Sequence, residues 1–338
     1  MVENLYVHFP FCRRKCSYCT LYSRTGVAQA DRDAYVRALA EELKTRGVRP
    51  ETLKTIYFGG GSPALCDLTP LLTSLHPQPS SLLAPSSSPE FTVELHPLDV
   101  TDELLKRLRD GGVNRISMGV QSLDDGILSA MGRGYTFAEA ERAFYRVKEH
   151  FENAGIDLIV GYPGETAALT PRHARLAKWG LKHCSVYALQ NERGLKGVVD
   201  DETVMNRLAT TAAFMKDIGL ERYEISNYAV PGYECRHNLA VWRGEDYVGL
   251  GEGACGRIGR DRTRNGKVVE TVSPEKDEIE RRIFRLRTTE GLDASGHPEW
   301  GQTLEKGLQT GLLVKSGDIY RLTARGLEVC DSILLDLV

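Results

Sequence analysis

The chain has 338 residues, of which 41% are hydrophobic and 26% are charged, and its formal net charge is −3. This composition is ordinary for a globular protein, and the mildly acidic balance argues against a general nucleic-acid binder, which usually has a basic surface. The sequence has no apolar run of about 18 residues that would predict a membrane span, and its N-terminus does not have the pattern of a secretory signal. We therefore expect a cytoplasmic protein of about two domains.

Strand and helix patterns alternate over residues 1–220. Short β-branched or aromatic runs, each ending in a loop signal, predict strands at 5–9, 54–58, 91–95, 114–120, 156–160 and 184–189. Amphipathic patterns predict helices at 31–47, 101–112, 136–150, 171–180 and 202–219. Such alternation indicates an α/β fold with a parallel sheet and right-handed crossovers. We expect a partial (βα)₆ TIM-like barrel, because polar residues recur at successive strand ends and a barrel brings those ends to one edge. An open doubly wound sheet is the alternative.

The pattern changes in the C-terminal third. Residues 221–272 are rich in glycine and aromatic residues, and we expect them to form a β-rich extension that lies against the barrel. Residues 273–338 are expected to be helical at first and to end in a winged-helix-like domain, with a hairpin turn at 316–318 and a helix near Thr323. We favour a packing or partner-docking role for this ending over DNA binding. The Pro- and Ser-rich residues 76–90 are expected to form a surface loop.

Three cysteines lie close together in the segment HFPFCRRKCSYC. Cys12, Cys16 and Cys19 have the spacing C-x₃-C-x₂-C, which is one ligand short of a closed tetrahedral zinc site. A [4Fe–4S] cluster on three thiolates keeps one iron open for a substrate or cofactor. We favour the cluster, and zinc completed by His8 or by a distant cysteine is the alternative. The remaining cysteines are scattered, and each is expected to be a small buried residue.

A glycine-rich loop follows the second predicted strand in the segment IYFGGGSPALC. Glycine permits positive φ and a close approach of the backbone, and exposed N–H groups at Gly59 to Gly61 are expected to bind a carboxylate or another anion. Polar residues also occur at later strand ends, namely Glu94, Gln121 and Asp157. Any one of them alone predicts a cap or a surface residue, but together they indicate a functional edge.

With these motifs assembled, the sequence resembles the radical S-adenosylmethionine (SAM) superfamily over nearly the whole chain. The cysteine trio and GGGSP match the superfamily. The segments that indicate one branch of it are YVHFPFC, GVNRISMGVQSLDDGILSAMGR and YEISNYAVPGYECRHNLAVWRGEDYVGLGEGACGRI. That branch contains the oxygen-independent coproporphyrinogen III oxidases and the HemW-type heme chaperones.

The resemblance implies a partial barrel of the radical SAM type and a set of cofactor ligands. Cys12, Cys16 and Cys19 would bind three irons of a [4Fe–4S] cluster, and SAM would chelate the fourth. Reduction by a donor such as flavodoxin or ferredoxin would cleave SAM to methionine and a 5′-deoxyadenosyl radical. The methionyl end of SAM would be held by Gly60, Gly61 and Ser62. Positions that contact SAM in the oxidases correspond to Tyr6, Tyr18, Glu94, Gln121, Arg133 and Asp157.

Three features favour the chaperone over the oxidase. The oxidases carry an added cysteine where this chain has Leu21, and they have a substantial segment before the first strand, which begins early here. The chaperone motif H-N-x-x-Y-W reads HNLAVW from His237 to Trp242, with Val241 in place of the tyrosine. We therefore expect a HemW-like chaperone that binds a [4Fe–4S] cluster, SAM and heme, with His237 and Trp242 at the heme, and that delivers heme to heme-accepting proteins. The alternatives are a coproporphyrinogen III oxidase and another radical SAM enzyme.

Overall fold

The computed structural model describes residues 2–75, 88–165 and 170–335, so most of the Pro- and Ser-rich segment lies outside the described residues. Parallel strands follow one another in chain order through the first part of the chain. They are β1 (Asn4–Phe9), β2 (Thr55–Gly60), β3 (Glu90–Leu95), β4 (Arg115–Gln121), β5 (Asn153–Val160) and β6 (His183–Ala188). Each strand overlaps a predicted one, which confirms the α/β fold with a parallel sheet.

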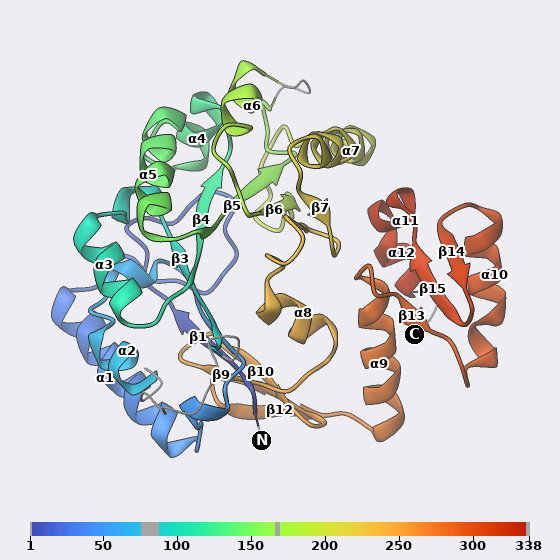
Figure 1. Ribbon diagram of the computed structural model, residues 1–338, viewed down its shortest axis with the longest axis horizontal. Coiled ribbons are helices and arrows are strands. Elements are labelled where there is room, and N and C mark those ends of the chain that lie inside the picture. Colours follow the sequence, from blue (N-terminus) through green and yellow to red (C-terminus); the bar gives the residue numbers. More distant parts are fainter. Residues whose placement is uncertain (1, 76–87, 166–169, 336–338) are drawn as a thin grey trace.

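Helices connect these strands and cover the outer face of the sheet (Figure 1). They are α1 (Gln29–Thr45), α2 (Thr69–Leu75), α3 (Asp102–Asp110), α4 (Asp125–Met131), α5 (Phe137–His150), α6 (Pro171–Leu176) and α7 (Asp201–Asp217), with short 3₁₀ turns at Pro50–Thr52, Pro63–Leu65 and Pro97–Asp99. Local sequence sets several helix starts, because Thr101 and Asp124 accept hydrogen bonds from the first turns of α3 and α4. Thr136 and Glu139 form a capping box at the start of α5.

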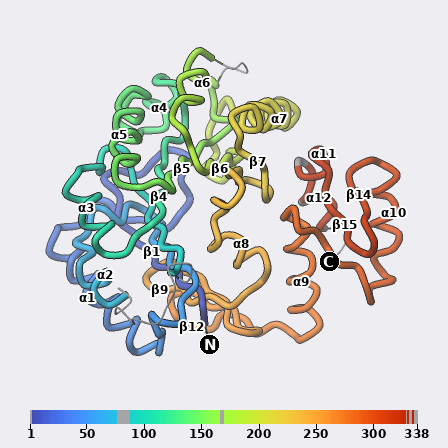
Figure 2. Tube along the Cα trace, in the orientation of Figure 1, coloured from blue at the N-terminus to red at the C-terminus, as the bar shows by residue number. Residues whose placement is uncertain are grey.

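Residues after α7 extend the same sheet at both edges. The added strands are β7 (Glu221–Arg222), β8 (Asn227–Ala229), β9 (Tyr247–Leu250), β10 (Cys255–Ile258), β11 (Asp261–Arg264) and β12 (Lys267–Thr271). β8 pairs antiparallel with β6, whereas β9 pairs in parallel with β1. The result is a twelve-stranded sheet in the order β12-β11-β10-β9-β1-β2-β3-β4-β5-β6-β8-β7. The short helix α8 (Arg236–Trp242) packs against β2 and lies in the middle of the view, between the barrel strands and the C-terminal part (Figure 2).

The main hydrophobic core lies between the parallel strands and the helices around them. In β1, Leu5, Val7 and Phe9 are fully buried in this core. Because successive side chains of a strand point to opposite faces, Tyr6 and His8 project from the other face, into the interior of the barrel. The sequence pattern of the strands therefore places apolar side chains outward against the helices and polar side chains inward.

The C-terminal part has its own small sheet and its own core. Its elements are α9 (Pro274–Leu286), β13 (Leu292–Asp293), a 3₁₀ turn (Pro298–Trp300), α10 (Gly301–Gln309), β14 (Leu313–Ser316), β15 (Ile319–Leu322), α11 (Ala324–Glu328) and α12 (Cys330–Leu335). The strands pair in the order β13-β15-β14, and Leu286, Trp300 and Leu304 are buried beside them. The hairpin and the helix that begins after Thr323 occur where they were predicted, and the winged-helix-like character of the ending stays a prediction. Within the described parts of the chain, no helix is long and apolar enough to cross a membrane.

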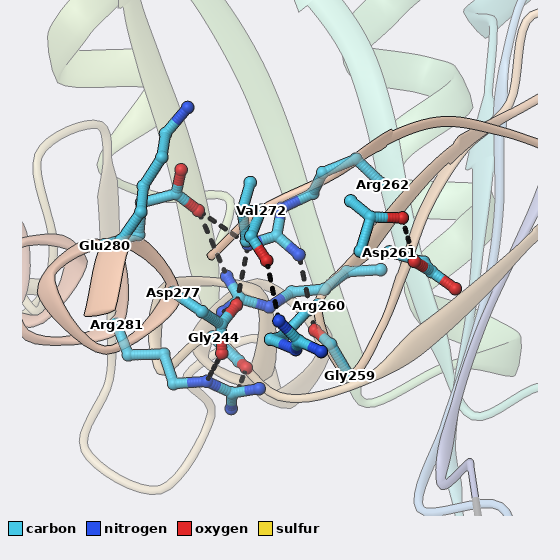
Figure 3. A network of polar contacts seen from close by, with 12 residues as sticks. Gly244, Gly259, Arg260, Asp261, Arg262, Val272, Asp277, Glu280 and Arg281 are labelled. Carbon is cyan, nitrogen blue, oxygen red and sulfur yellow. Dashed lines mark hydrogen bonds and ion pairs between the residues drawn. The ribbon is translucent and has the colours of Figure 1, made fainter. Parts of the chain in front are cut away.

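A network of arginines and carboxylates joins α9 to the β10–β11 hairpin (Figure 3). Asp277 Oδ1 accepts hydrogen bonds from Arg257 at 2.5 Å and from Arg262 at 2.8 Å, and its Oδ2 accepts one from Arg281 at 2.8 Å. Burial acts to raise the pKa of Asp277, but its hydrogen bonds to Arg262 and Arg281 outweigh burial and lower the pKa. The network therefore couples the C-terminal part to β10 and β11, near the β12 edge of the large sheet.

Candidate functional site

The loop that carries the cysteine trio follows β1 at the carboxyl ends of the parallel strands. Cys12, Cys16 and Cys19 are partly exposed free thiols. The Cys12 N–H donates to the Arg24 carbonyl at 2.9 Å, and the Cys19 N–H donates to the Cys16 carbonyl at 3.3 Å. These backbone bonds hold the loop in place, so the thiols stand at the edge where parallel α/β proteins place their chemistry.

His8 is hydrogen-bonded at both ring nitrogens, so it does not offer a fourth ligand to a zinc ion at the trio. Among the residues that the structure describes, no three His, Cys, Asp or Glu side chains are grouped so that they could hold one ion. His8 uses both ring nitrogens: Nε2 donates to the Tyr22 carbonyl at 2.9 Å, and Nδ1 accepts from the Tyr6 hydroxyl at 2.9 Å. Burial lowers the pKa of His8, which favours this neutral form. Three cysteines without this histidine suit a cluster, in which each thiolate binds a separate iron.

Gly61 packs directly on the cysteine loop. Its N–H donates to the Phe9 carbonyl at 2.7 Å, and the N–H of Ser62 donates to the Phe11 carbonyl at the same distance. A Cβ at Gly61 would stand 2.4 Å from the Phe11 oxygen and 2.9 Å from the sulfur of Cys12. Only glycine allows the two loops to approach this closely.

Glu94, near the end of β3, holds the middle of the glycine loop. Its Oε2 accepts from the Gly60 N–H at 3.1 Å, and its Oε1 accepts from the Tyr57 hydroxyl at 2.8 Å. Burial and the nearby Asp157 raise the pKa of Glu94 to about 7. The N–H groups of Gly60, Gly61 and Ser62 are thus all used within the protein. Contrary to the expectation, Gly60 and Gly61 therefore have no free N–H group to offer an anion.

Arg133 links the cysteine loop to the end of β4. One guanidinium nitrogen lies 3.4 Å from the sulfur of Cys16 and 3.5 Å from the hydroxyl of Tyr18, and the other donates to the Gly119 carbonyl at 2.6 Å. Gln121, the last residue of β4, has a φ of 71°, which is uncommon for a residue other than glycine. The structure therefore gathers Arg133, Tyr18 and Gln121 on the cysteine side of the barrel, and their contact with SAM stays a prediction.

The remaining predicted SAM residues face the barrel interior. Asp157 accepts a hydrogen bond from Ser117 at 3.0 Å, and burial raises its pKa. Tyr6 donates its hydroxyl hydrogen to His8, as described above. Asp157 and Tyr6 therefore lie on the inner face of the sheet, within the same polar interior as Glu94.

A cavity of about 860 Å³ connects this region with α8. The cysteine loop contributes Thr20, Leu21 and Tyr22 to its wall, and α8 contributes His237 and Val241. This volume lies within the range of small-molecule and cofactor sites. One cavity therefore joins the loop of the cysteine trio to the histidine of the HNLAVW motif.

The residues of the HNLAVW motif do not all face this cavity. His237 and Val241 lie four residues apart on one face of α8 and line the cavity wall. Trp242 packs edge-on against Phe284 at a centroid distance of 6.1 Å, and the guanidinium of Arg287 lies 4.6 Å from its ring. The structure thus places Trp242 against α9 and against Arg287, the residue that follows α9. Val241, which stands where the motif has a tyrosine, lies in the wall of the cavity.

His237 is buried and held by a neighbour in β2. Its Nδ1 lies 2.8 Å from the hydroxyl of Thr55, and burial together with Arg115 lowers its pKa to about 3. The ring therefore stays neutral at physiological pH. Nothing in the sequence singles out Thr55, because a threonine at the start of a strand is an ordinary residue there.

Cys255 is a second residue whose position differs from the prediction. It was expected to be buried, but it is exposed and lines the cavity. The other scattered cysteines, Cys66, Cys184, Cys235 and Cys330, are buried as expected. Cys255 is the first residue of β10, whose burial does not alternate, so the sequence pattern could not have predicted its exposure.

Comparisons with known proteins agree with these features. The model of the radical SAM superfamily matches residues 6–177, which is about half of the chain. The chain belongs to the radical SAM superfamily. It is 33% identical to the heme chaperone HemW of Synechocystis sp. over 94% of this chain and 85% of that protein. It is 32% identical to the heme chaperone HemW of Bacillus subtilis over 90% of this chain and 88% of that protein. Within the superfamily, it is a HemW-type protein.

A solved structure shows the same fold. The coproporphyrinogen III oxidase of Escherichia coli, a radical SAM enzyme, superposes with a TM-score of 0.79 at 21% identity, over 99% of this chain and 89% of that one. This likeness extends the shared architecture beyond the residues that the superfamily model matches. It therefore supports the α/β radical SAM fold for the chain as a whole.

Membership of the radical SAM superfamily implies a [4Fe–4S] cluster and SAM, and the residues present fit both. The trio supplies three free thiols on one loop, which are soft ligands suited to iron–sulfur clusters. Beside it, the position of Gly61 has no room for a Cβ. When bound, the reduced cluster supplies the electron that cleaves SAM.

Proposed function

We propose that this HemW-type protein is a cytoplasmic heme chaperone. In this proposal it binds a [4Fe–4S] cluster and SAM at the carboxyl ends of the barrel strands, binds heme beside His237, and delivers the heme to heme-accepting proteins. The observation that carries the proposal is the single cavity that reaches from the cysteine loop to His237. The relatives named heme chaperone HemW, which match nearly the whole chain, support it.

The cofactor end of the site follows from the residues around the trio. Cys12, Cys16 and Cys19 would hold three irons, and the fourth would be open to SAM. Because the N–H groups of Gly60 and Gly61 are used internally, this loop would hold the methionyl end of SAM through carbonyl oxygens, which accept hydrogen bonds from its amino group. Gly61 has no side chain that could keep SAM away from the cysteine loop.

Five further side chains would position SAM or adjust the charge around it. Glu94 and Asp157, when ionised, would supply the negative charge that suits a sulfonium cation, and Gln121 ends β4 with a φ of 71°. Arg133 brings a positive charge to 3.4 Å from the sulfur of Cys16. Since reduction adds negative charge to an iron–sulfur cluster, a guanidinium there favours the reduced state. Tyr18, which also contacts Arg133, would cover this side of the site.

The heme end of the site is the part of the cavity next to α8. Neutral imidazole is a common ligand of heme iron, and His237 lines the cavity in its neutral form. Val241 supplies an apolar wall where a macrocycle would pack. Trp242 lies against α9, so its expected role beside heme would require α8 to shift, and we propose that it instead anchors α8 to the C-terminal part.

Heme binding by anaerobically reconstituted protein tests this function. Wild type should bind one heme, and His237→Ala should weaken binding by roughly tenfold or more, because loss of an iron ligand costs at least as much as loss of a residue that orients one. His297→Ala is the matched control. His297 belongs to the C-terminal part and does not line the cavity, so this variant should bind heme like wild type. Equal affinity of wild type and His237→Ala would contradict the heme site.

The same preparation distinguishes a chaperone from an oxidase. With SAM and a reductant, a coproporphyrinogen III oxidase converts coproporphyrinogen III to protoporphyrinogen IX, whereas the chaperone should leave it unchanged and should pass bound heme to an apo-hemoprotein. Formation of protoporphyrinogen IX by the purified protein would overturn the chaperone assignment.

A further inference from the structure

Buried side chains from distant parts of the chain form a line of hydrogen bonds that ends at His237. The Nδ2 of Asn4 donates to the backbone carbonyl of Asp246 at 3.1 Å and to the carboxylate of Glu245 at 3.3 Å. The hydroxyl of Thr55 lies 2.9 Å from Asn4 Oδ1 and 2.8 Å from His237 Nδ1. Asn4 and Thr55 are each 2% exposed and His237 is 5% exposed. Water therefore does not compete for these bonds, and their directions can be worked out in turn.

The first member of the line sets the direction of every bond. A backbone carbonyl and a carboxylate accept hydrogen bonds, so the amide NH₂ of Asn4 faces Asp246 and Glu245, and its oxygen faces Thr55. The Thr55 hydroxyl has one hydrogen, which it donates to Asn4 Oδ1, so toward His237 it accepts. His237 must therefore carry its hydrogen on Nδ1.

The other ring nitrogen of His237 is consequently a free acceptor. In a neutral imidazole that carries its hydrogen on Nδ1, Nε2 holds a lone pair and no hydrogen. Among the described residues, the ring's hydrogen bond is the one to Thr55, and His237 lines the cavity. Aromatic rings surround it, with Tyr57 at 5.2 Å and both Tyr6 and Tyr247 at 6.4 Å between centroids. These rings do not supply a bond to Nε2, so the lone pair is available to a ligand in the cavity.

We propose that Asn4 and Thr55 are positioning residues that fix His237 as the Nδ1–H tautomer and present its Nε2 to the cavity as a ligand for heme iron. Histidines that bind metals commonly donate their other ring N–H to a fixed acceptor, which sets both the tautomer and the ring orientation. Here that acceptor is a hydroxyl whose own hydrogen is committed to Asn4. The identity of the ligand rests on the proposed heme function, whereas the tautomer is a property of the protein alone.

The line is assembled by the pairing of β9 with β1. Asn4 opens β1 and Tyr247 opens β9, and the two are partners in the parallel register. This pairing brings Asp246 to Asn4, while the pairing of β1 with β2 places Thr55 opposite Asn4. The sheet edge added by the C-terminal third of the chain therefore completes the support of His237.

Nitrogen NMR of protein labelled with ¹⁵N-histidine tests the tautomer without heme. The His237 signals are those that His237→Ala removes. In wild type they should show a protonated Nδ1 and an unprotonated Nε2 between pH 6 and 8. Thr55→Val keeps the shape of the side chain but removes the acceptor, so it should shift His237 toward the Nε2–H form, while Thr55→Ser should retain the wild-type signals. A wild-type Nε2–H form, or unchanged signals in folded Thr55→Val, would overturn the proposal.

Heme titration of the same variants tests the ligand. Thr55→Val should weaken heme binding by about 10–100-fold, the usual cost of losing a residue that orients a metal ligand, and Thr55→Ser should restore it. If Thr55→Val changes the tautomer but not the heme affinity, Nε2 is not the iron ligand and that part of the proposal is overturned. If His237→Ala binds heme like wild type, the proposed heme site fails while the NMR result still decides the tautomer.

Discussion

Gly61→Ala is the sharpest test of the contact between the glycine loop and the cysteine loop. The new Cβ would stand 2.4 Å from the Phe11 oxygen, 2.8 Å from the Phe9 oxygen and 2.9 Å from the Cys12 sulfur. Two of these atoms belong to the backbone and cannot rotate away, so the loops must separate. Separation breaks the 2.7 Å bonds from Gly61 and Ser62 to those oxygens, at about 1 kcal/mol each. Strain from overpacking adds about 1–3 kcal/mol, so the free energy of unfolding should fall by about 3–5 kcal/mol.

Urea unfolding and iron analysis together measure this effect. Gly301→Ala is the matched control, because nothing lies within 4 Å of a Cβ built there and its φ of −53° suits alanine. That variant should be as stable as wild type or slightly more stable. Gly61→Ala should unfold at a much lower urea concentration and should retain less iron after reconstitution, because Cys12 moves. Wild-type stability and a full iron content in Gly61→Ala would refute the close packing of the two loops.

Three other changes probe the cluster, the SAM site and the C-terminal contact. Cys16→Ala should hold no stable iron after reconstitution. Wild type and the control Cys66→Ala should each hold about four irons per chain. Stoichiometric zinc in wild type would contradict the cluster. The pKa of Glu94 is raised to about 7 by burial and by Asp157, so the protein gains a carboxylate as the pH rises through about 7. Cationic SAM should therefore bind more tightly at pH 8 than at pH 6. This increase in SAM affinity with pH should be larger in wild type than in Glu94→Gln. The same pH dependence of SAM affinity in both proteins would count against a contact between Glu94 and SAM. Asp277→Asn leaves three guanidinium groups around a neutral side chain. It should lower the unfolding free energy by about 2–3 kcal/mol. This loss is smaller than for a fully buried ion pair, because two of the arginines are partly exposed. The partly exposed control Asp293→Asn should change the unfolding free energy little. Equal stability of the two variants in thermal unfolding would refute the role of the network.

The barrel could be predicted because its signals are local. Each parallel strand is a short run such as the one at 54–58, and each helix repeats its apolar residues every three or four positions. The place of β9 could not be predicted in this way. A strand pattern at Tyr247–Leu250 does not reveal that its partner is β1, more than 240 residues earlier, because pairing depends on the path of the whole chain.

The same distinction separates the predicted from the missed parts of the site. Cys12, Cys16 and Cys19 stand out because their spacing is itself the chemical signal. Thr55 does not, because its role depends on a helix that contacts it from 182 residues away. The direction of Trp242 depends on the rotation of the short helix α8, which no pattern in seven residues determines.

The proposed function places heme iron at Nε2 of His237, in the cavity beside the cysteine loop. A crystal structure of the reconstituted protein with heme and SAM tests it most directly. We predict a macrocycle in this cavity, iron bonded to Nε2 of His237, and Nδ1 still within hydrogen-bond distance of Thr55. Heme bound at another surface, or iron held by other residues while His237 stays unligated, would show that His237 is not the heme ligand.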